Sequence, residues 1–361
     1  MADSIKRTGT ARLPLHNGKA PAWLFSRMTK LAKEITVAIV SDYGPGEMLK
    51  RLSDPFWFQA FGCVLGFDWH SSGVTTTVCA AVKEGIRGME SELGFFLAGG
   101  KGGTSRKTPA EIESVGHLIT VNPEHLVYAS RMAAKVDNNA VQDGYQLYHH
   151  VLCFTKDGSW AVVQQGMNAK DRYARRYHWL GEKVTDFVCE PHSAICGEKN
   201  AETLNLVAQE SAAARQTMTE IACHETPDKL FRELQRLREL ELPPRHAIAL
   251  ADIHPDRLYS ILVKTYESQP GDFESLLGLQ GVGARTLRAL SLVSEIIYGV
   301  PASFRDPARF SFAHGGKDGI PYPVDRKTYD RSIEILHSAL ERARVDDRVK
   351  LEAIKRLHLW V

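Results

Sequence analysis

Residues 276–290 read LLGLQGVGARTLRAL, two leucine-rich segments joined by the glycines Gly281 and Gly283. This spacing predicts a short helix, a tight turn that needs the backbone freedom of glycine, and a second helix. Val282 is expected to point into the core. The N–H groups that open the second helix have no intrahelical partner and lie at the positive end of its dipole. The turn therefore predicts a site for one phosphate group.

A helix-hairpin-helix of this kind binds DNA mainly through the backbone and with little sequence specificity, because phosphates carry no base identity. Arg285 and Arg288 lie one helical turn apart and, with Thr286 between them, are expected to add contacts to DNA. Such binding weakens as the salt concentration rises. The alternative is that the two glycines form only a close corner between packed helices.

A longer stretch around the turn resembles the helix-hairpin-helix DNA glycosylases. The resemblance runs from Leu258 to Gly283 and continues through Tyr298-Gly299-Val300-Pro301 to Val324-Asp325. It implies that Asp325 stabilises a cationic sugar as the base departs, and that Arg285 stands where lyase members carry a Schiff-base lysine. Arginine cannot act as that nucleophile, because its guanidinium stays protonated. The alternative role for Asp325 is to cap the helix that follows it.

The rest of the chain divides into segments of different periodicity. Helical spacing of apolar residues predicts one helix over 22–52, or two helices broken at Gly44-Pro45-Gly46. The runs 145–155 and 160–167 are rich in β-branched and aromatic residues, and Asp157-Gly158 between them predicts a β-hairpin. The stretch 201–222 contains neither glycine nor proline, so a connecting helix is expected there.

These segments predict an α+β domain over residues 1–197 with the β-hairpin in its sheet, a connecting helix over 198–225, and an all-α helix-hairpin-helix domain over 226–361. The net charge is only +2, so affinity for nucleic acid must come from local groups. The six cysteines form no C-x-x-C pair, and no apolar run is long enough to cross a bilayer. We therefore expect a cytoplasmic protein without a membrane partner.

Polar residues gather around the predicted β-hairpin in a pattern that suggests phosphodiester chemistry. Asp137 and Asp143 precede its first strand, which carries His149, so two carboxylates are expected beside a histidine. Such a set could hold Mg²⁺ or Mn²⁺. Lys135 and His178 would then stabilise charge or move protons. For each residue taken alone, a turn cap or a satisfied interior side chain is the alternative.

Other short blocks add candidate ligands and contacts. Asp68 and His70, in the turn-like Asp-Trp-His-Ser-Ser-Gly segment, are further candidate metal ligands. The glycine-rich stretch 99–107 is expected to be a flexible loop that closes over phosphate. Outside the turn at 281–283, the expected DNA contacts are Lys101, Arg106, Lys107, Arg175 and Arg176.

Two further patterns bear on the same region. Cys189, His192 and Cys196 have donor atoms for zinc, although three ligands at this spacing are a weak signal. The strings Arg7-Thr8-Gly9 and Asp54-Pro55-Phe56-Trp57-Phe58-Gln59, together with the blocks above, resemble the bacterial and archaeal domain-of-unknown-function family seven-six-three. That resemblance covers most of the chain and implies no activity.

Three functions are consistent with these patterns. The first is a DNA repair or processing enzyme, a metal-dependent nuclease with its site in the N-terminal domain and its duplex grip in the helix-hairpin-helix. The second is a DNA glycosylase that uses Asp325. The third is a non-catalytic DNA-binding module whose first domain recruits a partner.

Overall fold

The computed structural model describes residues 13–15, 20–67, 72–200, 203–237, 255–308 and 326–360. Asp68 and His70, expected as metal ligands, and Asp325, expected as the glycosylase aspartate, lie outside the described residues. Within those ranges, no helix combines the length and the apolar character that crossing a membrane requires.

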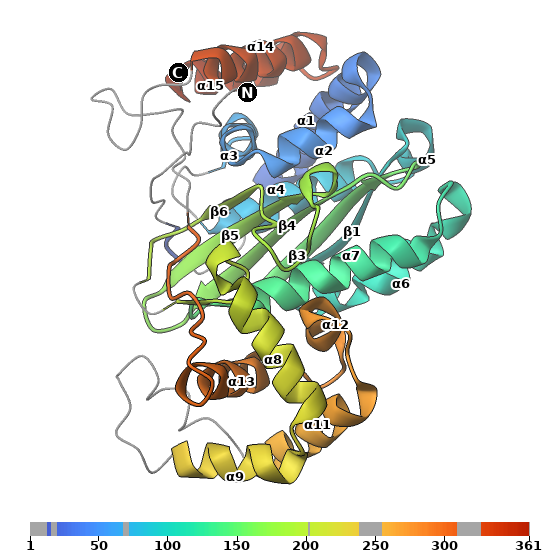
Figure 1. Cartoon of the computed structure of the whole chain (residues 1–361). Coiled ribbons are helices and arrows are strands. Elements are labelled where there is room, and N and C mark those ends of the chain that lie inside the picture. Colours follow the sequence, from blue (N-terminus) through green and yellow to red (C-terminus); the bar gives the residue numbers. More distant parts are fainter. Residues whose placement is uncertain are drawn as a thin grey trace.

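A five-stranded antiparallel sheet forms the centre of the molecule (Figure 1). Its strands, in spatial order, are β1 (Phe95–Lys101), β3 (Gln146–Thr155), β4 (Trp160–Asn168), β5 (Tyr173–Leu180) and β6 (Ala194–Cys196). The expected β-hairpin is confirmed as β3 and β4. Gly158 has a φ of +84°, a conformation that favours glycine, and Asp157 Oδ1 accepts a hydrogen bond from Ser159 N.

Four helices cover one face of the sheet: α1 (Ala22–Tyr43), α2 (Pro45–Ser53), α3 (Pro55–Val64) and α4 (Gly73–Gly85). The expected break between two N-terminal helices is confirmed at Gly44, which has a φ of +83°. Asp54 begins α3 by accepting a hydrogen bond of 2.8 Å from Phe56 N. Trp57 and Phe58 on α3 join Val151 and Val163 of the sheet in one buried cluster.

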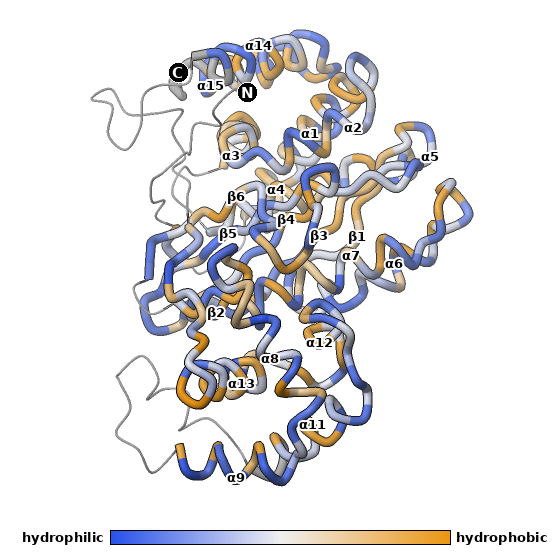
Figure 2. Tube along the Cα trace, viewed as in Figure 1, coloured by the Kyte–Doolittle hydropathy of each residue, from blue (hydrophilic) through white to orange (hydrophobic). Residues whose placement is uncertain are grey.

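The opposite face carries a second and larger set of helices. It comprises α6 (Thr108–Ser114), α7 (Pro123–Lys135), the π-turn η3 (Val136–Ala140), α8 (Ala212–His224), α9 (Pro227–Leu237), α11 (Pro255–Ser268), α12 (Phe273–Gly278) and α13 (Ala284–Ile296). Figure 2 shows apolar and polar residues alternating along α9, whose buried Leu230, Leu234 and Leu237 follow helical spacing. These leucines share one core with Phe154 and Trp179 of the sheet.

The expected connecting helix over 198–225 is shorter in the structure. Leu204–Asn205 forms strand β7, which pairs with β2 (Val141–Gln142), and α8 begins only at Ala212. Backbone pairing with β2 satisfies the polar groups of this segment and holds it extended, although its composition suits a helix.

The last two helices return to the first ones. α14 (Arg326–Arg342) packs on α1, and α15 (Asp347–Trp360) packs on α3. Leu336 and Leu340 belong to the same buried cluster as Trp57, and Arg356 Nη2 donates to the carbonyl oxygen of Val64 at 3.0 Å. The segment 226–361, expected as one all-α domain, is thus divided between the two faces of the sheet (Figure 1).

Candidate nucleic-acid turn and the buried polar network beside it

Residues Leu279–Gly283, which we call the glycine turn, join α12 to α13. Gly281 has a φ of +99°, a conformation that favours glycine. Gly283 is extended and begins α13 without any side-chain cap. Val282 is buried as expected, whereas Gly281 and Arg285 are exposed. The turn therefore presents backbone without side chains at the start of a 13-residue helix.

A short segment of the first half of the chain holds the glycine turn. Lys135 Nζ donates to the carbonyl oxygens of Leu277 at 2.6 Å and Leu279 at 2.7 Å. Gln142 Nε2 donates to the carbonyl oxygen of Ala284 at 2.8 Å, and Gln142 Oε1 accepts from Arg288 Nε at 2.7 Å. We call Lys135–Asp143 the docking segment, because both ends of the turn are fixed to it.

These contacts change the roles expected for three residues. Burial lowers the pKa of Lys135, with Lys264 adding to the effect, and both hydrogen bonds of its ammonium group go to the α12 end of the turn. Lys135 therefore holds the turn in place, with two of its three N–H donors bonded to backbone carbonyl groups. Thr286 is buried, so its side chain cannot reach DNA, and Arg288 is directed to Gln142.

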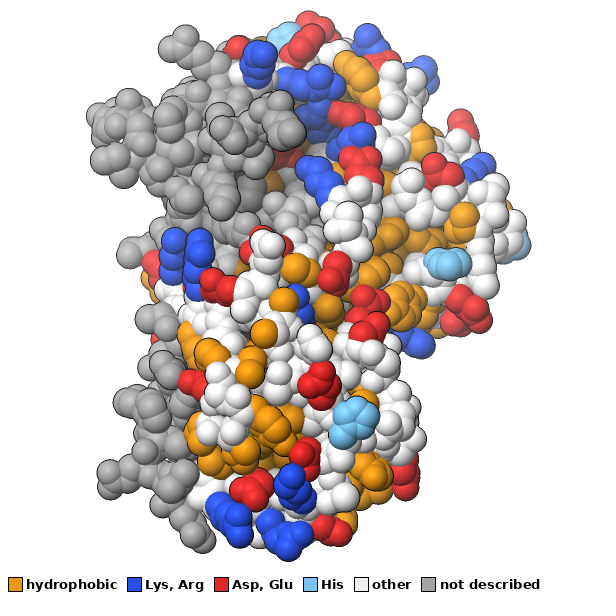
Figure 3. Space-filling view, in the orientation of Figure 1, with side chains coloured by type: hydrophobic (Ala, Val, Ile, Leu, Met, Phe, Trp, Pro, Cys, Tyr) orange, Lys and Arg blue, Asp and Glu red, His pale blue; other side chains and the backbone are white. Residues whose placement is uncertain are grey.

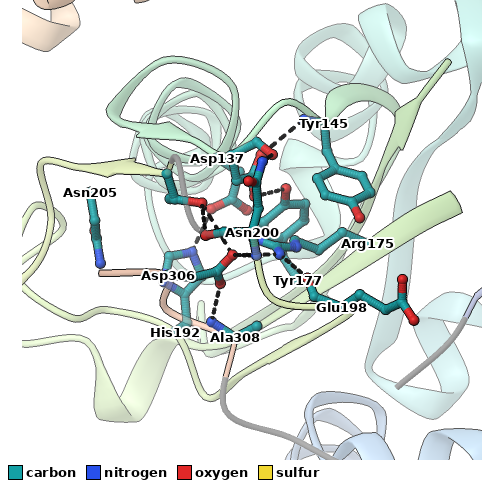
Figure 4. A network of polar contacts seen from close by, with 12 residues as sticks. Asp137, Tyr145, Arg175, Tyr177, His192, Glu198, Asn200, Asn205, Asp306 and Ala308 are labelled. Atoms are coloured by element: carbon teal, nitrogen blue, oxygen red, sulfur yellow. Dashed lines mark hydrogen bonds and ion pairs between the residues drawn. The ribbon is translucent and has the colours of Figure 1, made fainter. Parts of the chain in front are cut away.

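Asp137 is fully buried, and both of its carboxylate oxygens accept hydrogen bonds. Oδ2 accepts from Trp179 Nε1 at 2.9 Å and from Gln164 Nε2 at 2.5 Å. Oδ1 is paired with Nε2 of His192, whose ring meets the Trp179 ring edge-on at 4.5 Å between centroids. Figure 4 shows Asp137 and His192 within the same polar network.

The network continues from Asp137 toward α7. Gln164 Oε1 lies 2.8 Å from His150 Nδ1, and His150 Nε2 lies 2.8 Å from Ser130 Oγ. Burial lowers the pKa of His150, so its ring is neutral near pH 7. A continuous line of hydrogen bonds therefore joins Ser130 to His192 through the interior of the protein.

Asp143 belongs to a second, neighbouring part of the network. Its Oδ2 accepts from Arg175 Nη1 at 2.8 Å and from the hydroxyl group of Tyr177 at 2.7 Å. Arg175 Nη2 also donates to Asp306 Oδ2 at 2.8 Å (Figure 4). One guanidinium therefore joins two carboxylates. Burial lowers the pKa of Arg175, but Asp143 and Asp306 outweigh burial and raise it. Burial raises the pKa of Asp143, and Arg175 opposes that rise.

The arrangement of Asp137 and Asp143 does not fit a Mg²⁺ or Mn²⁺ site. The oxygens of Asp137 face N–H donors, and Asp143 is neutralised by Arg175. Among the described residues, no three histidine, cysteine, aspartate or glutamate side chains converge as a metal ligand set. His192, weighed with Cys189 and Cys196 as a zinc ligand, is instead directed to Asp137.

Several residues expected to act at a surface lie inside the protein, on the sheet face that meets α2–α4. His149 and His178 are completely buried, and burial lowers the pKa of each to about 3, so both rings are neutral and shielded from substrate. Arg176 is also fully buried, with Phe58 against its guanidinium at 4.7 Å. Arg175, on the other face, has no exposed surface either. Neither arginine can contact DNA in this fold.

A β-bulge explains why simple alternation along β3 misplaces one side chain. The pairing of β3 with β4 shifts between Leu147 and His149, so Tyr148 is an extra residue. Its hydroxyl group is hydrogen-bonded to Gln165, on the face that also carries His149. Alternation alone would place Tyr148 and His149 on opposite faces.

The glycine-rich stretch 99–107, expected to be a flexible loop, is the end of β1 followed by the 3-10 helix η1 (Gly102–Lys107). Gly99 has a φ of +100°, and a Cβ there would lie 2.3 Å from the carbonyl oxygen of His150. Close backbone packing therefore accounts for this glycine. The basic residues Lys101, Arg106 and Lys107 are exposed, as a phosphate contact requires.

Sequence reasoning missed the partners that organise the network. His192 was considered only as a zinc ligand, and its pairing with Asp137 spans 55 positions. Asp306 gave no signal, because it lies in a loop 131 positions from Arg175. The aromatic donors Trp179 and Tyr177 alternate with Arg176 and His178 along β5, and that alternation was the one available clue.

Comparison with known proteins gives one match. A family model described as protein of unknown function (DUF763) matches residues 9–324, a range that includes the sheet, the docking segment and the glycine turn and ends before α14. No curated protein and no solved structure matches the chain.

Proposed function

The chain belongs to the DUF763 family of proteins of unknown function, and we propose that it binds the sugar-phosphate backbone of DNA through the glycine turn. The observation that carries the proposal is the exposed backbone at the start of α13. Gly281 is exposed, Gly283 is half-buried, and no side chain caps the helix. N–H groups in that position bind phosphate well, because the helix dipole adds a positive field.

The way the turn is anchored supports the same proposal. Lys135 and Gln142 hold the carbonyl groups of Leu277, Leu279 and Ala284 at the two ends of the turn, and the N–H groups of Leu279 and Val282 are bonded to carbonyl oxygens of the same segment. The donors proposed for a phosphate are therefore the N–H groups at the start of α13. A turn fixed before binding loses little conformational freedom when it binds, so more of the contact energy appears as affinity.

The charge distribution favours a local grip over a broad basic surface. The net charge is +2, and on the face in Figure 3 the Lys and Arg side chains form separate groups interspersed with acidic ones. Exposed Arg285, in the first turn of α13, adds positive charge next to the backbone donors. The expected binding is therefore weak in sequence preference and sensitive to salt.

We further propose that the DNA is processed and not only held. The docking segment carries Asp137 and Asp143 and also fixes the turn, so a strand bound at the turn lies against the element that supports the polar network. Because the network does not fit Mg²⁺ or Mn²⁺, the proposed processing proceeds without a metal at these two carboxylates.

Gly283→Ala tests the binding proposal without disturbing the fold. The backbone at Gly283 is extended, and a Cβ there would lie 3.8 Å from Asn139 Oδ1, an ordinary contact. Its methyl group would nevertheless keep a phosphate from the amides. Gly271→Ala is the matched control, because nothing lies within 4 Å of its Cβ position and it is outside the turn.

Fluorescence anisotropy with a labelled duplex at low salt measures the effect. Losing one charge-assisted hydrogen bond weakens binding by about 1.5–3 kcal/mol, or roughly tenfold to a hundredfold. We expect that loss for Gly283→Ala and wild-type affinity for Gly271→Ala. Equal affinity in the two variants, or no binding of DNA by the wild type, rejects the proposal.

A further inference from the structure

We infer that His192, oriented by the buried carboxylate of Asp137, is a proton-transfer group for a reaction on DNA held at the glycine turn. The inference rests on the proposed function, which supplies the substrate, DNA. The reacting group is identified from the geometry of the polar network. His192 would accept a proton from a water molecule or hydroxyl group beside the bound strand.

The hydrogen bonds of Asp137 determine which nitrogen of His192 carries the proton. Trp179 Nε1 and Gln164 Nε2 both donate to Asp137 Oδ2, so the group behaves as an acceptor. Nε2 of His192 faces the other oxygen, Oδ1, and must donate to it. A neutral imidazole has a single N–H group, so Nδ1 of His192 retains its lone pair. The network therefore prepares Nδ1 as a base.

The same pairing places a carboxylate directly beside the ring. When Nδ1 accepts a proton, the ring becomes an imidazolium ion whose positive charge lies directly beside the Asp137 carboxylate. That attraction is stronger in the interior than in water, because the local dielectric constant is lower. Asp137 is thus a positioning residue that sets the tautomer and stabilises the charged ring, a division of labour known from aspartate–histidine pairs.

Burial distinguishes His192 from the other histidines of the sheet. The His192 side chain is 7% exposed and Asp137 is completely buried, so the pair has an outer and an inner member. His149 and His178 are buried, and each has a pKa of about 3, so neither accepts a proton near pH 7. Both ring nitrogens of His150 are engaged inside the protein.

The position of Asp137 relates the pair to the proposed DNA site. Asp137 and Asn139 lie two residues apart in the π-turn η3, and Asn139 Oδ1 is the nearest atom to the Cβ position of Gly283. Lys135, the last residue of α7, donates a hydrogen bond to the carbonyl oxygen of Leu279. The π-turn η3 and the end of α7 therefore connect the glycine turn to the carboxylate that orients His192.

Asp137→Asn provides a sharp test, because the surrounding donors dictate how the new amide must lie. Trp179 and Gln164 still require an oxygen acceptor, so the asparagine NH₂ group replaces Oδ1 and faces His192 Nε2. That NH₂ group can only donate. Nε2 must then accept, and the ring proton moves to Nδ1, which loses its basic lone pair. Asp171→Asn, at an exposed position, is the matched control.

Nitrogen-15 NMR of histidine-labelled full-length protein reads the tautomer directly, and diethyl pyrocarbonate followed by mass spectrometry reads the reactivity of Nδ1. In the wild type we expect the Nε2–H tautomer and modification of His192. In Asp137→Asn we expect the Nδ1–H tautomer and modification slowed at least about tenfold. Exposed His117 and His125 report equal reagent access in both proteins.

A duplex titration separates this inference from the binding proposal. We expect the ring signals of His192 to shift when duplex DNA binds, and His192→Gln to bind duplex as the wild type does. Wild-type His192 in the Nδ1–H form, or ring signals unmoved when anisotropy shows bound DNA, overturns the inference. If the Asp137→Asn variant does not fold, the tautomer of His192 in the wild type and its response to duplex DNA still test the inference. Absence of DNA binding by anisotropy rejects the proposed function instead.

Discussion

The ammonium group of Lys135 lies 2.7 Å from the carbonyl oxygen of Leu279, across 144 positions of sequence. Together with its bond to Leu277, this contact ties the end of α12 to the helix that precedes Asp137. Lys135 therefore has a structural role, because it fixes the glycine turn to the first half of the chain.

Lys135→Met is expected to destabilise the protein by about 2–3 kcal/mol, since it removes hydrogen bonds from a charged donor to two partly buried carbonyl groups. Methionine keeps the length of the side chain, so the packing of α7 is retained. Urea denaturation measures the change, with Lys170→Met at an exposed position as the control. Equal losses in the two variants would show that Lys135 does not hold the turn.

Arg175→Met is expected to destabilise the protein by about 3–5 kcal/mol, because two buried carboxylates, Asp143 and Asp306, lose their common counter-ion. Arg236→Ala, which breaks an exposed pair with Glu233, should cost less than about 1 kcal/mol. Thermal or urea unfolding compares the two. A small effect at Arg175 would mean that the buried guanidinium is not structural.

The adjacent histidines of β3 should respond to the same substitution to different extents. Both ring nitrogens of His149 are buried without a hydrogen-bond partner, so His149→Leu should leave stability at pH 7 within about 1 kcal/mol of the wild type. His150→Leu removes the partners of Ser130 and Gln164 and should cost about 2–3 kcal/mol. Similar costs for both variants would contradict the assigned hydrogen bonds.

Acid should weaken the fold through the same buried rings. Burial lowers the pKa of His149 and of His178 from 6.5 to about 3, so between those values the unfolded chain binds more protons than the folded one. The stability that each contributes is complete above pH 6.5 and is lost as the pH falls toward 3. His149→Leu should therefore flatten the acid side of the stability curve by up to about 1.4 kcal/mol per pH unit. An unchanged slope would show that His149 is protonated in the folded state.

Gly99→Ala should cost about 2–4 kcal/mol, because its φ of +100° strains any other residue and the new Cβ would collide with the His150 carbonyl oxygen. Gly103→Ala, with nothing within 4 Å of its Cβ position, should change stability by less than about 1 kcal/mol. Circular dichroism during heating distinguishes the two. Comparable melting temperatures would argue against close packing of β1 on β3 at this point.

The parts of the fold that local sequence predicted are those with strong local signals. The break at Gly44-Pro45 and the Asp157-Gly158 hairpin depend on backbone preferences within a few residues. Strand β7 was expected to be helical, because its conformation depends on pairing with β2, about 60 positions away. The packing of α14 on α1 and of α15 on α3 likewise depends on contacts between distant parts of the sequence, which hydrophobic periodicity does not predict.

The sequence identified several residues of the polar network but not the hydrogen bonds between them. Asp137 and Asp143 were recognised as unusual, and both prove to be buried acceptors. Their partners Trp179, His192 and Tyr177 come from distant strands and loops, so spacing along the chain carried no information about them. Arg175 and Arg176 were expected to contact DNA, but alternation along β5 places one on each face of the sheet, where both are buried.

Hydrogen–deuterium exchange of the segment around the glycine turn, with and without duplex DNA, tests the central claim most directly. The amides of Gly283 and Ala284 should exchange readily in the free protein, slow down when duplex is added at low salt, and recover when added salt releases the DNA. Exchange at these two amides that is already slow without DNA, or that stays the same while DNA is bound, would contradict the proposed backbone grip.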